Sequence, residues 1–133
     1  MIYVDTGALL ARHLTRDQHH ERAAAYWNRL AAARERCLTS SYVLDETITL
    51  LGRRAGYGFA AERARNLYAS SHLTIVRPDD QDEQNALDLF EKYADQRVSF
   101  TDCISFALMT RASVKRVFTF DVHFQRAGFR ALP

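Results

Sequence analysis

The sequence has few cysteines, which cross-link small folds, and few prolines, which interrupt regular secondary structure. Only two cysteines, Cys37 and Cys103, and two prolines occur in 133 residues. Two cysteines give no metal–thiolate spacing, and in a domain of this size we expect both to be buried as small apolar groups. There is also no repeat and no Pro/Gly-rich linker, which predicts one domain over residues 1–133.

Long hydrophobic runs are missing as well. No apolar stretch approaches the roughly 20 residues that a membrane-spanning helix needs. The N-terminus shows no basic region followed by an apolar stretch and a cleavage site, so we expect no signal peptide and a cytoplasmic setting. The composition, 47% hydrophobic and 26% charged, is that of an ordinary globular protein.

Lysine is scarce, and only Lys92 and Lys115 occur among the 18 basic residues. The net charge is +2, with 16 acidic residues. If the four acids discussed below belong to a metal site, 12 acids remain against 18 basic residues, an excess of six positive charges. This favours a polyanionic partner, and arginine binds phosphate in a bidentate way. A GC-rich genome that encodes arginine in place of lysine is an equally good explanation.

Short runs rich in β-branched and aromatic residues alternate with longer segments of helical periodicity. This alternation predicts an α/β fold with a mostly parallel sheet. We expect strands at 1–4, 37–39, 73–76, 117–120 and, as a last strand, 129–132. We expect helices after residue 6, from about 17, over 42–51, around 59–68, over 79–93 and 102–109, and a short turn from 121.

Four acidic residues fall where an expected strand ends or near the start of an expected helix. Asp5 and Asp121 follow strands, Asp102 precedes an apolar helix, and Glu46 lies early in the 42–51 helix. The carboxyl ends of parallel strands face one crevice, where ligands bind. Carboxylates that meet there repel one another unless a cation neutralises them, and hard oxygen ligands suit Mg²⁺ or Mn²⁺. The pattern therefore indicates a site for metal-dependent phosphoryl chemistry.

Each acid also has a simpler structural explanation. Asp5 is a possible helix cap, although Thr6 can take that role, and Asp121 can end its strand in an Asx-turn. Asp102 suits the dipole of its helix, but the helix is apolar enough to be buried, where an acid needs a partner. At about 100° per residue Glu46 borders the apolar arc of its helix whereas Asp45 points away, so Glu46 is the candidate.

Three further groups of polar residues need a separate interpretation. We interpret Asp79, Asp80 and Asp82 as capping and solvated residues at a helix start. His19 and His20 are interpreted as surface residues. His123 is interpreted as a solvated turn residue, with orientation of a phosphate as the alternative.

The four acids in their local settings resemble those of the PIN-domain ribonucleases, specifically the VapC-type toxins of toxin–antitoxin pairs. The matching segments are 2–6, 39–47, 100–107 and 119–124, the last with the pattern Thr-Phe-Asp-x-x-Phe. The resemblance implies a three-layer α/β/α fold with a central parallel sheet. It also implies that Asp5, Glu46, Asp102 and Asp121 form an acidic Mg²⁺ or Mn²⁺ site, with Thr6 and Thr119 as accessory polar groups.

The expected function is that of a metal-dependent endoribonuclease acting as the toxin of such a pair. The resemblance further implies a homodimer and a small antitoxin partner of the VapB type. Apolar residues of the segments 26–30 and 59–68 are candidates for these contacts. Candidates for RNA contact are Arg12, Arg16, Arg53, Arg54, Arg97 and Arg126. The alternative is a non-catalytic RNA- or protein-binding module of the same fold, which we expect to have lost one of the acids.

Overall fold

A computed structural model describes all 133 residues and contains one five-stranded parallel sheet. The strand order is β3-β2-β1-β4-β5. The strands are β1 (Ile2–Val4), β2 (Cys37–Ser40), β3 (Leu73–Val76), β4 (Arg116–Phe118) and β5 (Arg130–Leu132). All five expected strands are therefore present, including the last one. Every neighbouring pair is parallel, which confirms the predicted sheet.

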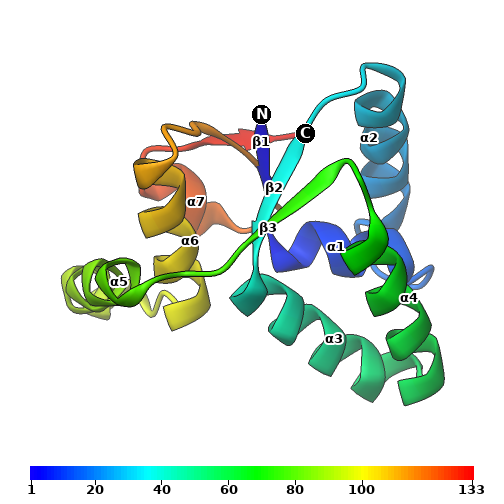
Figure 1. Ribbon diagram of the computed structural model, residues 1–133, viewed down its shortest axis with the longest axis horizontal. Coiled ribbons are helices and arrows are strands. Elements are labelled where there is room, and N and C mark those ends of the chain that lie inside the picture. Colours follow the sequence, from blue (N-terminus) through cyan, green and yellow to red (C-terminus); the bar gives the residue numbers. More distant parts are fainter.

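Helices cover both faces of this sheet and give the three-layer α/β/α arrangement that the sequence predicted (Figure 1). One side carries α1 (Thr6–His13), α2 (His20–Ala32) and α4 (Tyr57–Ala69), and α3 (Ser41–Ala55) packs against α1 and α4. The other side carries α5 (Asp80–Lys92), α6 (Phe100–Arg111) and α7 (Val122–Arg126), with a short 3-10 turn, η1 (Ala94–Gln96), before α6.

The strand order explains why a binding site forms where it does. From β1 the chain moves outward through β2 to β3, and it then crosses back to β4 on the other side of β1. The connections that leave β1 and β4 therefore go to opposite faces of the sheet, because parallel crossovers share one hand. A crevice opens between the carboxyl ends of two such strands, and it is the usual ligand site of open α/β sheets.

The core lies on both sides of β1, which is completely buried. The Tyr3 hydroxyl and the Ser105 hydroxyl, 2.8 Å apart, form a buried hydrogen bond between β1 and α6. Thr39 on β2 donates its hydroxyl proton to the carbonyl oxygen of Val4 at 2.8 Å. These polar contacts fix the end of β1, and with it the position of the residues that follow. Cys37 and Cys103 are free and buried, as expected.

One interpretation of the acidic segment before α5 is wrong. Asp79 caps α5 as expected and forms a capping box with Asp82. Asp82, however, is not solvated: it is buried and accepts two hydrogen bonds of 2.8 Å from the guanidinium group of Arg111. This bidentate pair joins the start of α5 to the end of α6. Sequence periodicity could not reveal it, because the two residues are 29 positions apart.

Candidate active site

A cleft at the carboxyl ends of β1 and β4 brings together all four acids that the sequence singled out. Its volume is about 530 Å³, and we call it the acidic cleft. Its lining residues are Asp5, Thr6, Gly7, Leu10, His19, Glu46, Leu50, Arg97, Ser99, Asp102, Phe120, Asp121 and His123. The acids come from four separate parts of the chain, and only the fold makes them neighbours. The cleft therefore lies at the crevice that the strand order creates.

Asp5 occupies the N-cap position of α1, but its side chain makes no capping hydrogen bond. The expectation that Thr6 caps this helix is wrong, because Thr6 is already its first residue. Asp5 Oδ2 instead accepts a hydrogen bond of 2.8 Å from the Thr119 hydroxyl. Only 4% of Asp5 is exposed, so its carboxylate is held at the bottom of the cleft.

Thr119 joins the ends of β1 and β4 through its hydroxyl group. The oxygen donates to Asp5 and accepts from the backbone N–H of Asp121 at 2.9 Å. Asp121 then caps α7 by accepting from the backbone N–H of His123 at 2.9 Å. A single hydroxyl thus fixes the spacing of two of the four acids. The resemblance implied only that Thr119 is an accessory polar group of the site, without naming these contacts.

Asp102 and Glu46 reach the cleft from helices on opposite sides of the sheet. Ser99 caps α6 by accepting from the backbone N–H of Asp102 at 3.1 Å, which fixes the first turn of that helix. Ser40 caps α3 in the same way at Val43 and sets the rotation of that helix. Glu46 is therefore half-buried in the cleft while Asp45 is exposed, as the helical arc predicted.

The surroundings of two of the four carboxylates, Asp5 and Asp102, disfavour the ionised form. Burial above all, with smaller contributions from the charges of Asp121 and Glu46, raises the pKa of Asp5 to about 6 against the opposing hydrogen bond from Thr119. Burial likewise raises the pKa of Asp102 to about 8, with added repulsion from Asp5 and Asp121. Like charges in a partly desolvated site favour the protonated form. A bound cation would reverse this effect.

The donor atoms of the cleft fit a divalent cation. All four acids offer oxygen ligands, which hard cations such as Mg²⁺ and Mn²⁺ prefer. The Thr6 hydroxyl supplies a second observation, because Thr6 is 5% exposed and its Oγ1 is buried with no hydrogen-bond partner. A buried hydroxyl is normally paired, and a missing ligand or water is one cause of such an exception. Three groups, Asp102, Asp121 and His123, lie with one ligand atom each within 4.8 Å of the others.

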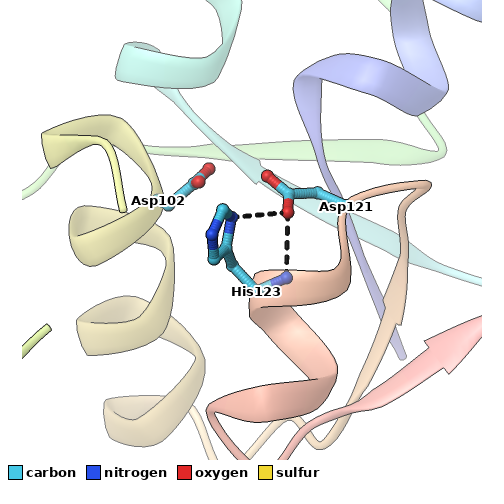
Figure 2. A group of neighbouring side chains, drawn as sticks. All are labelled: Asp102, Asp121 and His123. Carbon is cyan, nitrogen blue, oxygen red and sulfur yellow. Dashed lines mark hydrogen bonds and ion pairs between the residues drawn. The ribbon is translucent and has the colours of Figure 1, made fainter. Parts of the chain in front are cut away.

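Three residues of the cleft were not assigned to it from the sequence. His123 was expected to be solvated, but its side chain is only 23% exposed and lies beside Asp102 and Asp121 (Figure 2). His19 stacks on Phe120 with ring centroids 4.2 Å apart. Arg97 was proposed only as an RNA contact among six arginines, and it alone of the six lines the cleft. Hydrophobic periodicity could not have found these residues, because His19 and Arg97 lie in turns and His123 lies in the five-residue helix α7.

A second hollow lies on the helical side of the sheet that carries α1, α2 and α4. We call it the arginine groove, after Arg12, Arg34 and Arg63. It is also lined by His13, Trp27, Leu30, Ala31, Glu35, Cys37, Asn66, Leu67, Ser70, His72 and Leu73. Arg12 lies over the Trp27 ring and Arg63 over the Phe59 ring, at 4.6 and 5.0 Å from the ring centroids. The groove therefore combines apolar surface with positive charge.

None of the three arginines of this groove forms an ion pair. The one nearby acid, Glu35, is occupied by the N-terminal amine at 3.0 Å and by Arg116 at 2.6 Å. Arg63 Nε and His13 Nε2 are buried without hydrogen-bond partners. Burial, followed by the charges of Arg12 and Arg63, lowers the pKa of His13 to about 4. The groove is thus an unpaired cationic surface.

None of the helices is long and apolar enough to span a lipid bilayer.

Comparison with known proteins relates the whole chain to one family. The family model of the PIN domain matches residues 2–130. The 23S rRNA-specific endonuclease VapC20 of Mycobacterium tuberculosis is 33% identical over 129 residues, which cover 97% of this chain and 95% of the relative. A VapC ribonuclease of Archaeoglobus fulgidus is 27% identical over 124 residues, covering 91% and 77% of the two chains.

Solved structures agree with this relationship. The crystal structure of the Mycobacterium tuberculosis VapC20, described as a Sarcin-Ricin loop cleaving toxin, superimposes with a TM-score of 0.87 at 31% identity. The match covers 97% of this chain and 96% of that one. A chain of a toxin–antitoxin complex from Klebsiella pneumoniae matches with a TM-score of 0.66 at 14% identity, covering 100% and 97% of the chains. This second likeness shows the shared fold.

Proposed function

The chain belongs to the PIN-domain family and is an endoribonuclease of the VapC toxin type, and on this premise we propose that the acidic cleft is its catalytic site. The proposed ligands of one or two Mg²⁺ or Mn²⁺ ions are Asp5, Glu46, Asp102 and Asp121, with Thr6 and Thr119 as accessory groups. The observation that supports the proposal is the meeting of these four acids in one cleft. Residues 1–133 would act together as one nuclease domain.

The chain's own residues then have distinct tasks in hydrolysis of the phosphodiester bond. When bound, the divalent ion would supply an activated water and charge stabilisation at the phosphate. Thr119 keeps the Asp5 carboxylate oriented, and the Ser99 cap keeps Asp102 at the start of α6. Arg97, at the edge of the acids, is placed to bind a phosphate of the RNA backbone. In-line attack by water would leave a 5′-phosphate and a 3′-hydroxyl.

We propose that the RNA substrate is a structured loop of 23S rRNA. The support is the relative that is named as a 23S rRNA-specific endonuclease and described as a Sarcin-Ricin loop cleaving toxin. Two features of this chain suit an exposed loop base. The acidic cleft has a volume of about 530 Å³, and among its lining residues His19 and Phe120 form a stacked pair of flat rings. Stacking on aromatic side chains is the common way to hold an unpaired RNA base.

The test is cleavage of synthetic RNA hairpins by the purified protein with Mg²⁺ or Mn²⁺, and with EDTA as the control. We expect one main cut in a sarcin–ricin stem-loop, little cutting of a hairpin with a scrambled loop, and none in EDTA. Cleavage of both hairpins alike would contradict the loop as substrate. Absence of metal-dependent cleavage on any RNA, with RNA still bound, would favour the non-catalytic alternative.

We further propose that the arginine groove receives an antitoxin segment that is apolar on one side and acidic on the other. The main apolar contact would be the half-buried Trp27, which belongs to one of the two helices that the sequence suggested for partner contacts, whereas Leu30 and Leu67 are only 7% and 4% exposed. The acidic contacts would be Arg12, Arg34 and Arg63, which have no carboxylate partner within the chain. Complementary charge sets the register and speed of such an association.

Reversal of charge in the groove tests this partner. Arg63→Glu should weaken binding of the co-expressed antitoxin at least about 10-fold, because the variant replaces an attraction by a repulsion. RNA cleavage should be unchanged, since Arg63 does not line the acidic cleft. Arg65→Glu on the same helix is the matched control, because Arg65 is exposed and outside the groove. Equal affinity of both variants and the wild type, measured by calorimetry, would place the antitoxin elsewhere.

A homodimer is proposed as well, with the outer face of α5 as its contact. Leu87 and Phe90 are 44% and 45% exposed on this face, and Phe90 continues into the core through an edge-to-face contact with Phe100. Contiguous exposed apolar patches mark contacts between proteins, and Leu87 and Phe90 lie three positions apart on the same helix. Phe90→Asp should then give a monomer in light scattering, while an unchanged dimer mass would remove α5 from the interface.

A further inference from the structure

His123 carries its proton on the nitrogen that faces away from the acids. Its Nε2 lies 3.1 Å from the carbonyl oxygen of Gln96, which can only accept a hydrogen bond. Nε2 must therefore be the donor. In the neutral imidazole the other ring nitrogen, Nδ1, then holds a free lone pair. The 3-10 turn η1 thus fixes the tautomer of a histidine at the edge of the acidic cleft.

This free nitrogen points into the group of carboxylates. Nδ1 lies 2.7 Å from Asp121 Oδ1, and one oxygen of Asp102 completes a set of ligand atoms within 4.8 Å of one another. Figure 2 shows the two carboxylates pointing toward one another with the imidazole ring beside them. Nδ1 is nevertheless buried without a hydrogen-bond partner. The two atoms, Nδ1 and Asp121 Oδ1, are therefore close together without the alignment of a hydrogen bond, and this needs an explanation.

Two arrangements can account for this short distance. A doubly protonated ring could form an ion pair with Asp121, but the N–H direction would then have to point at Oδ1, which the geometry does not satisfy. Alternatively, the nitrogen and a carboxylate oxygen can be adjacent ligands of one ion. Adjacent ligands with bonds of about 2.1 Å at right angles lie about 3 Å apart, and their lone pairs meet at a third point. The second arrangement agrees with the observed geometry.

The surroundings of His123 are also those of a metal-binding histidine. Such residues commonly donate their second ring N–H to a backbone carbonyl or carboxylate, which fixes the ring and its tautomer. The Gln96 carbonyl supplies this contact. Asp121 is steadied in turn, because its Oδ1 accepts the backbone N–H of His123 at 2.9 Å. The buried, unpartnered hydroxyl of Thr6 in the same cleft is a separate indication that a ligand is missing.

We infer that His123 Nδ1 is a ligand of the catalytic ion, beside Asp121 and Asp102, and that this nitrogen makes the site prefer Mn²⁺ to Mg²⁺. Both ions favour oxygen donors, but Mg²⁺ demands near-ideal octahedral oxygen coordination, whereas Mn²⁺ is a member of the first-row transition series whose ions bind sites of mixed nitrogen and oxygen ligands. The inference rests on the proposed function, because it adds a ligand to the proposed acidic site. The inference goes beyond the proposed function because it makes one non-acidic residue, His123, determine which ion the site prefers.

The experiment follows Mn²⁺ bound to the full-length protein by electron paramagnetic resonance. Loss of the free Mn²⁺ signal measures affinity, competition with Mg²⁺ measures preference, and pulsed spectra detect a nitrogen coupled to the bound ion. Protein labelled with ¹⁵N-histidine identifies the nitrogen as one of an imidazole. The main variant is His123→Asn, which keeps a polar oxygen near the position of Nδ1. The matched control is His19→Gln, which changes a histidine of the same cleft.

The expected result is nitrogen coupling in the wild type and in His19→Gln, and none in His123→Asn. Affinity of His123→Asn for Mn²⁺ should fall at least about 10-fold and that for Mg²⁺ less than about 3-fold, as loss of one nitrogen ligand predicts. If His123→Asn does not fold, the ¹⁵N-labelled His19→Gln protein still tests the inference, because nitrogen coupling in it cannot come from His19. Mn²⁺ binding without nitrogen coupling would overturn the inference and leave the acidic site intact. A wild-type protein that binds neither ion would instead contradict the proposed function.

Discussion

Asp102→Asn is expected to lower RNA cleavage by at least about 10³-fold and, at the same time, to raise the melting temperature of the metal-free protein. The loss follows if Asp102 is an ion ligand, since electrostatic stabilisation worth about 4 kcal/mol at the transition state corresponds to about 10³ in rate. The gain in stability follows because Asp102 is 7% exposed and its charge is opposed by burial and by Asp5 and Asp121. Asparagine removes that charge at nearly the same volume.

The combination of the two effects separates a functional acid from a structural one. A carboxylate that only caps a helix would lose a little stability on conversion to the amide and would leave cleavage intact. Asp45→Asn is the matched control, because Asp45 is exposed and next to Glu46 in sequence. It should change neither property. An Asp102→Asn protein that melts lower than the wild type and still cuts RNA would remove Asp102 from the proposed ion site.

The second large effect is the loss of stability of the metal-free wild type as the pH rises from about 6.5 to 8.5. An acid whose pKa is raised by folding stabilises the fold fully below its ordinary pKa, and this contribution is lost as the pH rises through the folded value. That value is about 6 for Asp5, whose contribution is therefore largely lost before the range begins, and about 8 for Asp102, whose contribution is still being lost within it. The melting temperature in EDTA should therefore fall across this range.

Other ionisable groups make a control necessary for this measurement. The lowered pKa values of Glu35 and Asp82 act only in acid, outside the range. His13 has the opposite sign, since its pKa is lowered to about 4 and the stability it contributes is lost below about pH 6.5. Comparison with the Asp102→Asn variant removes the contributions of Glu35, Asp82 and His13, because both proteins share them. The variant should show a smaller fall than the wild type, and saturating Mn²⁺ should remove most of the wild-type fall. Parallel curves for the two proteins in EDTA would contradict the raised pKa of Asp102.

The sequence was sufficient for the fold and for bringing the four acids together. Central strands of a parallel sheet are buried on both faces, so the apolar run at 1–4 was recognisable by composition, and β1 is indeed fully buried. The choice of Glu46 over Asp45 needed only the 100° rotation per residue of an α-helix. The carboxyl-end rule for parallel sheets then placed Asp5 and Asp121 on the same edge. These inferences succeeded because each depends on local geometry repeated along the chain.

What the sequence did not reveal depends on partners that are distant in sequence. Asp82 was expected to be solvated because it lies in an acidic helix start, yet Arg111 on α6 binds it with both oxygens. His123 was expected to be a solvated turn residue, yet it lies in α7 and the carbonyl oxygen of Gln96 in η1 contacts its ring beside the acids. Thr6 was expected to cap α1 and is its first residue instead. Hydrophobic periodicity identifies the buried face of an element, and it carries no information about which polar group will lie opposite.

The most direct test of the proposed site is X-ray diffraction from crystals soaked in Mn²⁺, with anomalous scattering used to locate the ion. We expect an anomalous peak in the acidic cleft, bound by oxygens of Asp5, Asp102 or Asp121, and no such peak in crystals of Asp102→Asn. An ion found only outside the cleft, in a protein that cleaves RNA in the same buffer, would show that these four carboxylates are not the catalytic metal site.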